Sequence, residues 1–138
     1  MTRINLISPK ELTDQHLIAE YREITMVPAA LKRTINSKAG LQLNQIPKEF
    51  TLNKGHVKFF YNKGLYLQKR YNQLIKEMKK RGFNPNPNRK FPKEIFLPSL
   101  YNDWNPSLKD LNVIRERIKS KIAQKPNWYK MNGLKIIN

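Results

Sequence analysis

The sequence predicts an all-α fold with three main helices, long loops and no significant sheet. Three stretches repeat their apolar residues at helical spacing, and no stretch sustains the period-two alternation of a half-buried strand. Five prolines between positions 85 and 106 argue against regular structure in that segment. Because 138 residues can bury one modest core but not two, we expect a single compact domain over residues 1–138.

The first helix is expected to begin at about Asp14. Ser8-Pro9-Lys10-Glu11 and Thr13-Asp14 both carry helix-start signals, and we assign the first to a short turn and the second to the helix. Pro28 should kink or interrupt this helix, because proline lacks an N–H group and clashes with the preceding turn. The apolar stripe of the helix consists of Leu17, Tyr21, Ile24, Pro28, Leu31 and Ile35.

The second and third helices each have recognisable ends. The second follows Asn62-Lys63-Gly64 and ends at Gly82, a glycine suited to a left-handed cap. The third follows Asn105-Pro106-Ser107 and stops near Pro126. Their buried faces comprise Leu67, Tyr71, Leu74, Ile75 and Met78 in the second helix, and Leu111, Ile114, Ile118 and Ile122 in the third. The proline-rich segment between them is expected to be a long loop.

Charge is the strongest compositional signal. Lys and Arg number 27 against 10 acidic residues, so the formal net charge is +17. Between positions 50 and 93, twelve basic residues accompany a single acid, Glu77. Such an excess favours a polyanionic partner, and nucleic acid is the first candidate. A cationic surface that serves solubility alone is the plainer alternative.

Several classes of protein are excluded or disfavoured. The chain has no cysteine, which rules out disulfides, thiolate metal sites and cysteine nucleophiles. No apolar run approaches the roughly 20 residues needed to span a bilayer, so we expect no membrane partner. His16 and His56 are isolated in the sequence, and no metal-ligand spacing or phosphate-binding loop is present. We expect a monomer in the cytoplasm, at the nucleoid or in a virus-infected cell, without metal or cofactor.

The remaining candidate for a catalytic group is the amine at the N-terminus. Initiator methionine is normally removed before a small side chain, which would expose the α-amine of Thr2. The reference pKa of an α-amine is about 7.7 to 8.0, against about 10.4 for lysine, so part of it is a neutral nucleophile at pH 7. Nearby cations such as Arg3 and Arg22 would lower this pKa further. Threonine at position 2 is also common for reasons of processing alone.

A carboxylate on the first helix could assist that amine. At 100° per residue, Arg22 and Glu23 lie opposite the Leu17 stripe, on the same side as Gln15, with His16 at the flank. A glutamate there can be an ordinary solvated acid. On a surface that binds phosphates, however, it lowers affinity by repulsion, and this favours a chemical role for Glu23.

Five separated motifs, in one order, resemble a known family. "MTRINL", "DQHLIAEYRE", "GHVKFFY", "KRGFN" and "KIAQKPNWYK" are similar to the pyrimidine-dimer DNA glycosylases with abasic-site lyase activity, of the bacteriophage endonuclease V type. The similarity covers nearly the whole chain and is weakest at residues 26–52 and 85–106. The phage enzyme has arginine where this chain has Met26, so one phosphate contact must be missing or come from elsewhere, with the lysine-rich second helix as a candidate source.

The resemblance implies a mechanism and a set of contacts. The α-amine of Thr2 would attack C1′ of the 5′ sugar of a cyclobutane dimer in double-stranded DNA, form an imine, and cleave the strand by β-elimination at the abasic site. Glu23 would serve the same site. The residues assigned by resemblance to the DNA-contacting side are Arg3, Gln15, His16, Arg22, Arg117 and Lys121. The tail residues Trp128 and Lys130 could add stacking and phosphate neutralisation, although terminal aromatics often pack onto the domain instead.

Two alternatives remain open from the sequence. A non-enzymatic basic protein, either an architectural DNA- or RNA-binding module or a ribosome-associated protein, would account for the charge and the helices but not for the order of the motifs. A family member that retains Met1 would keep the fold and lose the activity.

Overall fold

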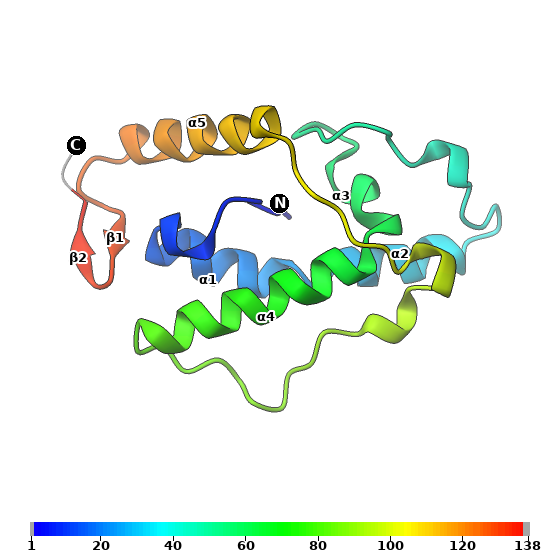
Figure 1. Cartoon of the computed structure of the whole chain (residues 1–138), viewed down its shortest axis with the longest axis horizontal. Helices are drawn as coiled ribbons and strands as arrows, with labels where there is room; N and C mark the ends of the chain where they lie inside the picture. Colours follow the sequence, from blue (N-terminus) through cyan, green and yellow to red (C-terminus); the bar gives the residue numbers. More distant parts are fainter. Residues whose placement is uncertain (1, 137–138) are drawn as a thin grey trace.

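The computed structural model describes residues 2–136, and its elements confirm the all-α prediction (Figure 1). Short 3-10 turns and a small hairpin accompany the α-helices. The α-helices are α1 (Asp14–Glu23), α2 (Met26–Ile35), α3 (His56–Phe59), α4 (Gly64–Lys80) and α5 (Leu108–Gln124). The 3-10 turns are η1 (Pro9–Glu11), η2 (Leu43–Gln45), η3 (Phe60–Asn62), η4 (Lys93–Ile95) and η5 (Pro98–Leu100).

The first predicted helix is interrupted, as expected for the effect of Pro28. α1 ends at Glu23 and α2 begins at Met26, which places Pro28 in the first turn of α2, where a missing N–H is tolerated. The two start signals also act as predicted. Ser8 caps η1, and the Thr13 hydroxyl accepts a hydrogen bond from the His16 backbone at the start of α1.

The ends of α4 and α5 confirm the sequence prediction too. Gly82 adopts a φ of +87°, in the left-handed region, and the Phe83 N–H donates to the Met78 carbonyl at 2.9 Å, which closes the end of α4. At the start of α5, Ser107 and Asp110 form a reciprocal capping box.

The N-terminal segment occupies the space between the helices. It runs between α5 on one side and the α1 and α4 pair on the other (Figure 1). Ile4, Leu6 and Ile7 of this segment are buried and belong to the same core as the stripes of α1, α2 and α4. Because these residues are packed in the core, the N-terminal segment is much better ordered than chain termini usually are.

The proline-rich segment is ordered by packing rather than by regular structure. Phe91, Phe96 and Leu100 insert into the main core, and η4 and η5 form where the prolines allow short turns. The helical Gly64 has no room for a side chain, since a Cβ there would lie 2.6 Å from the Phe96 ring.

The C-terminal part forms a two-stranded antiparallel hairpin of β1 (Lys130–Met131) and β2 (Leu134–Lys135). It lies beside the start of α1, at the left of Figure 1. Within residues 2–136, no helix combines the length and apolarity needed to cross a membrane.

Candidate active site

Three successive backbone amides anchor the N-terminal segment to three side chains. Arg3 N–H donates to Glu23 Oε1 at 3.1 Å, and Ile4 N–H donates to His56 Nε2 at 2.9 Å. Asn5 N–H donates to Glu20 Oε1 at 3.1 Å. Since the bonded amides belong to the residues immediately after Thr2, Thr2 lies one peptide unit from the amide that bonds to Glu23.

Thr2 therefore lies near Glu23, the residue with which the family resemblance pairs it. The Thr2 hydroxyl donates to Met26 Sδ at 3.2 Å, and the Thr2 carbonyl accepts from the Arg3 guanidinium at 3.0 Å. Glu23 is half-buried at the end of α1. Met1, whose removal the sequence predicts, lies outside the described residues.

Two guanidinium groups border the same place. Arg117 of α5 donates to Asn5 Oδ1 at 3.4 Å and is half-buried. Burial lowers the pKa of Arg117, the charge of Arg3 lowers it further, and Glu23 opposes the shift. The buried Nε atom of Arg3 has no hydrogen-bond partner within residues 2–136. The two neighbouring positive charges favour an anion such as phosphate at this place.

A buried ion pair between α4 and α1 also contacts the N-terminal segment. Arg70 of α4 forms bonds of 2.6 and 2.9 Å to the Glu20 carboxylate and also donates to the Ile7 carbonyl. Both side chains are almost completely buried. The sequence analysis missed this pair, although a signal was present: Glu20 adjoins the apolar stripe of the first helix, and Arg70 stands between Leu67 and Tyr71.

The end of α1 is capped by a residue from the proline-rich loop. The Arg89 guanidinium donates to the carbonyl of Tyr21 at 2.6 Å and to that of Arg22 at 3.1 Å. It also donates to the Thr25 hydroxyl at 2.8 Å and lies 4.3 Å from the centre of the Tyr21 ring. A cation on the last carbonyls of a helix suits its dipole and fixes the turn that carries Glu23.

The first turn of α1 holds the C-terminal hairpin. Gln15 accepts from the Lys130 N–H at 2.9 Å and donates to the Trp128 carbonyl at 2.9 Å. The Asp14 carboxylate accepts from the N–H groups of Asn132 and Gly133, at 3.0 and 2.8 Å. Gln15, expected on the DNA side, thus has its amide engaged by the tail.

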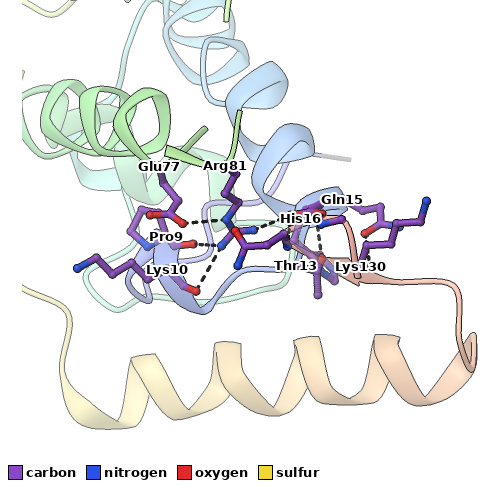
Figure 2. Close-up of polar contacts among 11 residues, drawn as sticks. Pro9, Lys10, Thr13, Gln15, His16, Glu77, Arg81 and Lys130 are labelled. Atoms are coloured by element: carbon purple, nitrogen blue, oxygen red, sulfur yellow. Dashed lines mark hydrogen bonds and ion pairs between the residues drawn. The ribbon is translucent and has the colours of Figure 1, made fainter. Parts of the chain in front are cut away.

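Arg81 completes this junction from the end of α4. It pairs with Asp14 at 3.0 Å and with Glu77 at 2.8 Å, and its side chain is 1% exposed. Figure 2 shows the guanidinium directed at Glu77 and at the backbone of Pro9 and Lys10, with Gln15 and Lys130 paired on the other side of His16. The i,i+4 spacing of Glu77 and Arg81 was a sequence signal for one of these pairs, whereas Asp14, Pro9 and Lys10 belong to other elements and no sequence pattern pointed to them.

His16 lies between the Arg81 ion pairs and the Gln15–Lys130 pair (Figure 2). Its ring stacks on Tyr129 with centroids 4.8 Å apart, and Nδ1 is 2.6 Å from the Thr13 hydroxyl. Burial lowers the pKa of His16 to about 4, Arg117 lowers it as well, and Glu20 opposes the shift. His16 is accordingly neutral at pH 7, so its contacts are hydrogen bonds and stacking rather than charge pairs.

The remaining predicted contact residues come from different parts of the chain: Arg22 from α1, Lys121 from α5, and Trp128 and Lys130 from the C-terminal part. The Arg22 and Lys121 side chains are exposed, Lys121 lying close enough to His16 to lower its pKa. Trp128 is 50% exposed and Lys130 is exposed, whereas Tyr129 is buried. The tail joins α1 at Gln15, and a rise of 1.5 Å per residue puts that anchor roughly 12 Å from Glu23 along the helix. The predicted residues therefore gather around Glu23 at one end of α1 and around Gln15 at the other, and Arg117 of α5 lies close enough to both ends to interact with Glu23 and with His16.

The junction of Asp14 with the hairpin leads to a prediction. Replacing Asp14 by Asn removes the charge that pairs with buried Arg81 and one acceptor for the turn. We expect a loss of about 1–3 kcal/mol in unfolding free energy. Amide exchange should accelerate at residues 128–135 and not in α4. The exposed Asp103→Asn serves as the control, and unchanged exchange in the hairpin would contradict the assignment.

Acid should destabilise the protein through its two histidines. Burial lowers the pKa of His56 to about 4 from the ordinary 6.5, with Arg3 and Arg117 adding to the effect and the Thr51 carbonyl and Glu20 opposing it. In the unfolded chain the His56 ring binds a proton near pH 6.5, whereas in the folded chain it binds one only near pH 4. Stability is therefore full above pH 6.5 and declines as pH falls through this window, by ~3 kcal/mol for His56.

Urea unfolding at pH 7, 6, 5 and 4.5 would measure this decline. The variant His56→Gln should show a shallower loss between pH 6.5 and 4.5, since it lacks the titrating ring. An equally steep loss in the variant would assign the effect to other groups.

The fold and site together define a small, strongly basic helical protein with a carboxylate and two guanidiniums gathered at its N-terminal segment. Comparison with known families matches residues 1–91 to the family described as pyrimidine dimer DNA glycosylase. The match covers about two thirds of the chain, and the protein belongs to this family. The family's description implies DNA as the substrate and glycosylase action in the repair of pyrimidine dimers. Within residues 2–136, no three acidic or histidine side chains gather as a metal site.

Proposed function

We propose that the protein excises cyclobutane pyrimidine dimers from duplex DNA through its N-terminal amine and then cleaves the strand as an abasic-site lyase. The observation that carries the proposal is the hydrogen bond from Arg3 N–H to the half-buried Glu23 carboxylate, one residue after the proposed nucleophile Thr2. Lysine amines are weaker candidates because of their higher ordinary pKa.

The chemistry proceeds in two stages. The neutral Thr2 amine bonds to sugar C1′ as the C1′–N bond to the 5′ pyrimidine breaks, with the leaving base taking the electron pair and then a proton. The carboxylate of Glu23 stabilises the cationic character that develops on the sugar. Loss of an amine proton and opening of the sugar ring leave a protonated imine between Thr2 and C1′. This imine acidifies C2′, and removal of a C2′ proton expels the 3′ phosphate.

Charge around the site supports DNA binding. Arg3 and Arg117 flank Glu23, so a phosphate placed between the guanidiniums would hold the sugar near the terminal amine. Arg22 and Lys121 add exposed charge on the same two helices, α1 and α5. The hairpin carries Trp128 and Lys130 at the other end of α1, where they could contact the flanking duplex.

A hollow next to the site could receive an extruded base. It has a volume of about 450 Å³ and is lined in part by Tyr21, Arg22, Phe83 and Arg89. Because a dimer in a duplex hides its sugar C1′, the DNA must bend or expel a nucleotide before the amine can reach it. We place the adenine opposite the lesion in this hollow, while the dimer stays in the helix.

Borohydride trapping tests the proposal. Processed protein is incubated with a duplex that carries one thymine dimer, reduced during the reaction, and digested for mass spectrometry. We expect a single adduct on the Thr2 α-amine. Attachment to a lysine, or no adduct with either the dimer or an abasic duplex, would refute the mechanism. A purely architectural protein would bind the same duplex with salt-sensitive affinity and form no adduct, which separates the second candidate function from the first.

A further inference from the structure

His56 is isolated in the sequence but makes a defined pair of hydrogen bonds in the structure. Its Nε2 atom accepts from the Ile4 N–H at 2.9 Å, and its Nδ1 atom lies 2.8 Å from the Thr51 carbonyl oxygen. A backbone N–H can only donate and a carbonyl can only accept. The hydrogen of the neutral ring must therefore be on Nδ1, which leaves Nε2 as a permanent acceptor.

The surroundings keep His56 in that form. The residue is 1% exposed, and the rings of Phe50 and Phe60 meet its imidazole edge-to-face at centroid distances of 5.4 Å. Burial lowers the pKa of His56 to about 4, so protonation does not compete for Nε2 at neutral pH. The preceding Gly55 is packed so tightly that a Cβ would lie 2.8 Å from the Pro47 ring, which holds the start of α3 in place.

The hydrogen bond between His56 and the Ile4 amide fixes the backbone close to the N-terminal residues. Ile4 is fully buried and lies two residues after Thr2. Its amide is the middle one of three anchored amides, between the Arg3 bond to Glu23 and the Asn5 bond to Glu20. Glu23 must also be available to the reaction, so an anchor that takes no part in the chemistry is needed to keep the segment in register.

We propose that His56 is a positioning residue for the terminal amine: by accepting the Ile4 amide hydrogen bond, it sets where Thr2 stands relative to Glu23. The inference rests on the proposed function. His56 touches no reacting atom, and its contribution is the location of the backbone two residues from the nucleophile. A displacement of about 1 Å at a nucleophile can cost on the order of 10²-fold in rate.

Two substitutions by side chains of similar size distinguish the effect of the hydrogen-bond acceptor at position 56 from the effect of filling the space there. His56→Gln can keep an oxygen near the position of Nε2, whereas His56→Leu fills the space without an acceptor and leaves a buried N–H unpaired. Three quantities are measured for each: the single-turnover rate of borohydride-trapped adduct with an abasic duplex, the Kd for that duplex, and amide exchange at Ile4.

We expect trapping by His56→Leu to fall roughly 10²-fold while Kd changes less than about threefold, with faster exchange at Ile4. His56→Gln should recover most of the rate. Because the leucine variant could fail to fold, the amide bond between Arg3 and Ile4 is also replaced by an ester, which removes the donor and leaves His56 untouched. The ester protein should lose trapping to a similar extent.

Normal trapping by the ester protein, or equal losses in folded His56→Gln and His56→Leu, would overturn the inference and leave the proposed function standing. A wild-type protein that forms no adduct at Thr2 would remove the proposed function, and the inference with it.

Discussion

Glu23→Gln is expected to reduce strand incision at a thymine dimer by at least about 10²-fold, while duplex affinity stays within about threefold of the wild type. The substitution keeps the shape of the side chain and an acceptor for the Arg3 N–H, which lies 3.1 Å from Glu23 Oε1. It removes the negative charge that would stabilise the cationic sugar. Affinity should not fall, because the lost charge repels phosphate.

The measurement is single-turnover incision of a defined duplex with protein in excess, together with Kd at several salt concentrations. Glu94→Gln, an exposed carboxylate on η4, makes the same change in net charge away from the site and should incise normally. A fully active Glu23→Gln protein would contradict the role assigned to this carboxylate, whatever residue carries the adduct.

Arg70→Met is expected to have the largest effect on stability. Arg70 forms two hydrogen bonds to Glu20, and its removal would leave the carboxylate buried without its counter-charge. Breaking a buried pair in this way costs about 3–5 kcal/mol, a large part of the 5–15 kcal/mol typical of a domain. Glu20 also holds the Asn5 amide, so the N-terminal segment should loosen before the helices unfold.

Urea unfolding gives the free energy, and amide exchange at residues 3–7 reports the segment. Lys69→Met is the matched control, because the neighbouring Lys69 pairs with Asp103 on the surface and should contribute less than about 1 kcal/mol. The double variant Glu20→Gln/Arg70→Met should recover part of the loss, since no unpaired charge remains. A double variant as unstable as the sum of the single changes would show that the two groups do not act as a pair.

The local parts of the fold could be predicted from the sequence because their causes are local. Thr13, Ser107 and Gly82 mark helix ends through hydrogen bonds and backbone conformations that involve only nearby residues. The stripe at Leu17, Tyr21 and Leu31 shows which side of a helix is buried, and those residues are indeed in the core. The pairing of Thr2 with Glu23 came from resemblance, since spacing alone shows only that Glu23 lies opposite the stripe.

The supporting half of the site could not be predicted in this way. Periodicity indicates that a face is buried but not which element packs against it, so Arg70 gave no indication of Glu20, fifty positions earlier. His56 was set aside as an isolated histidine because its partner is a backbone amide, which no side-chain motif records. The sequence analysis counted Arg81 and Arg89 among the twelve basic residues of positions 50–93, yet both also donate hydrogen bonds to backbone carbonyls of other elements.

Sequence alone determined the helical class, the main helix boundaries, the cationic excess and the identity of the residue behind Met1. Tertiary structure alone decided that the first residues thread through the core and that three successive amides meet Glu23, His56 and Glu20. The physical reason is range. Helix formation and capping depend on neighbours a few positions apart, whereas the alignment of a chain terminus depends on hydrogen bonds to side chains that only the packed core brings within reach.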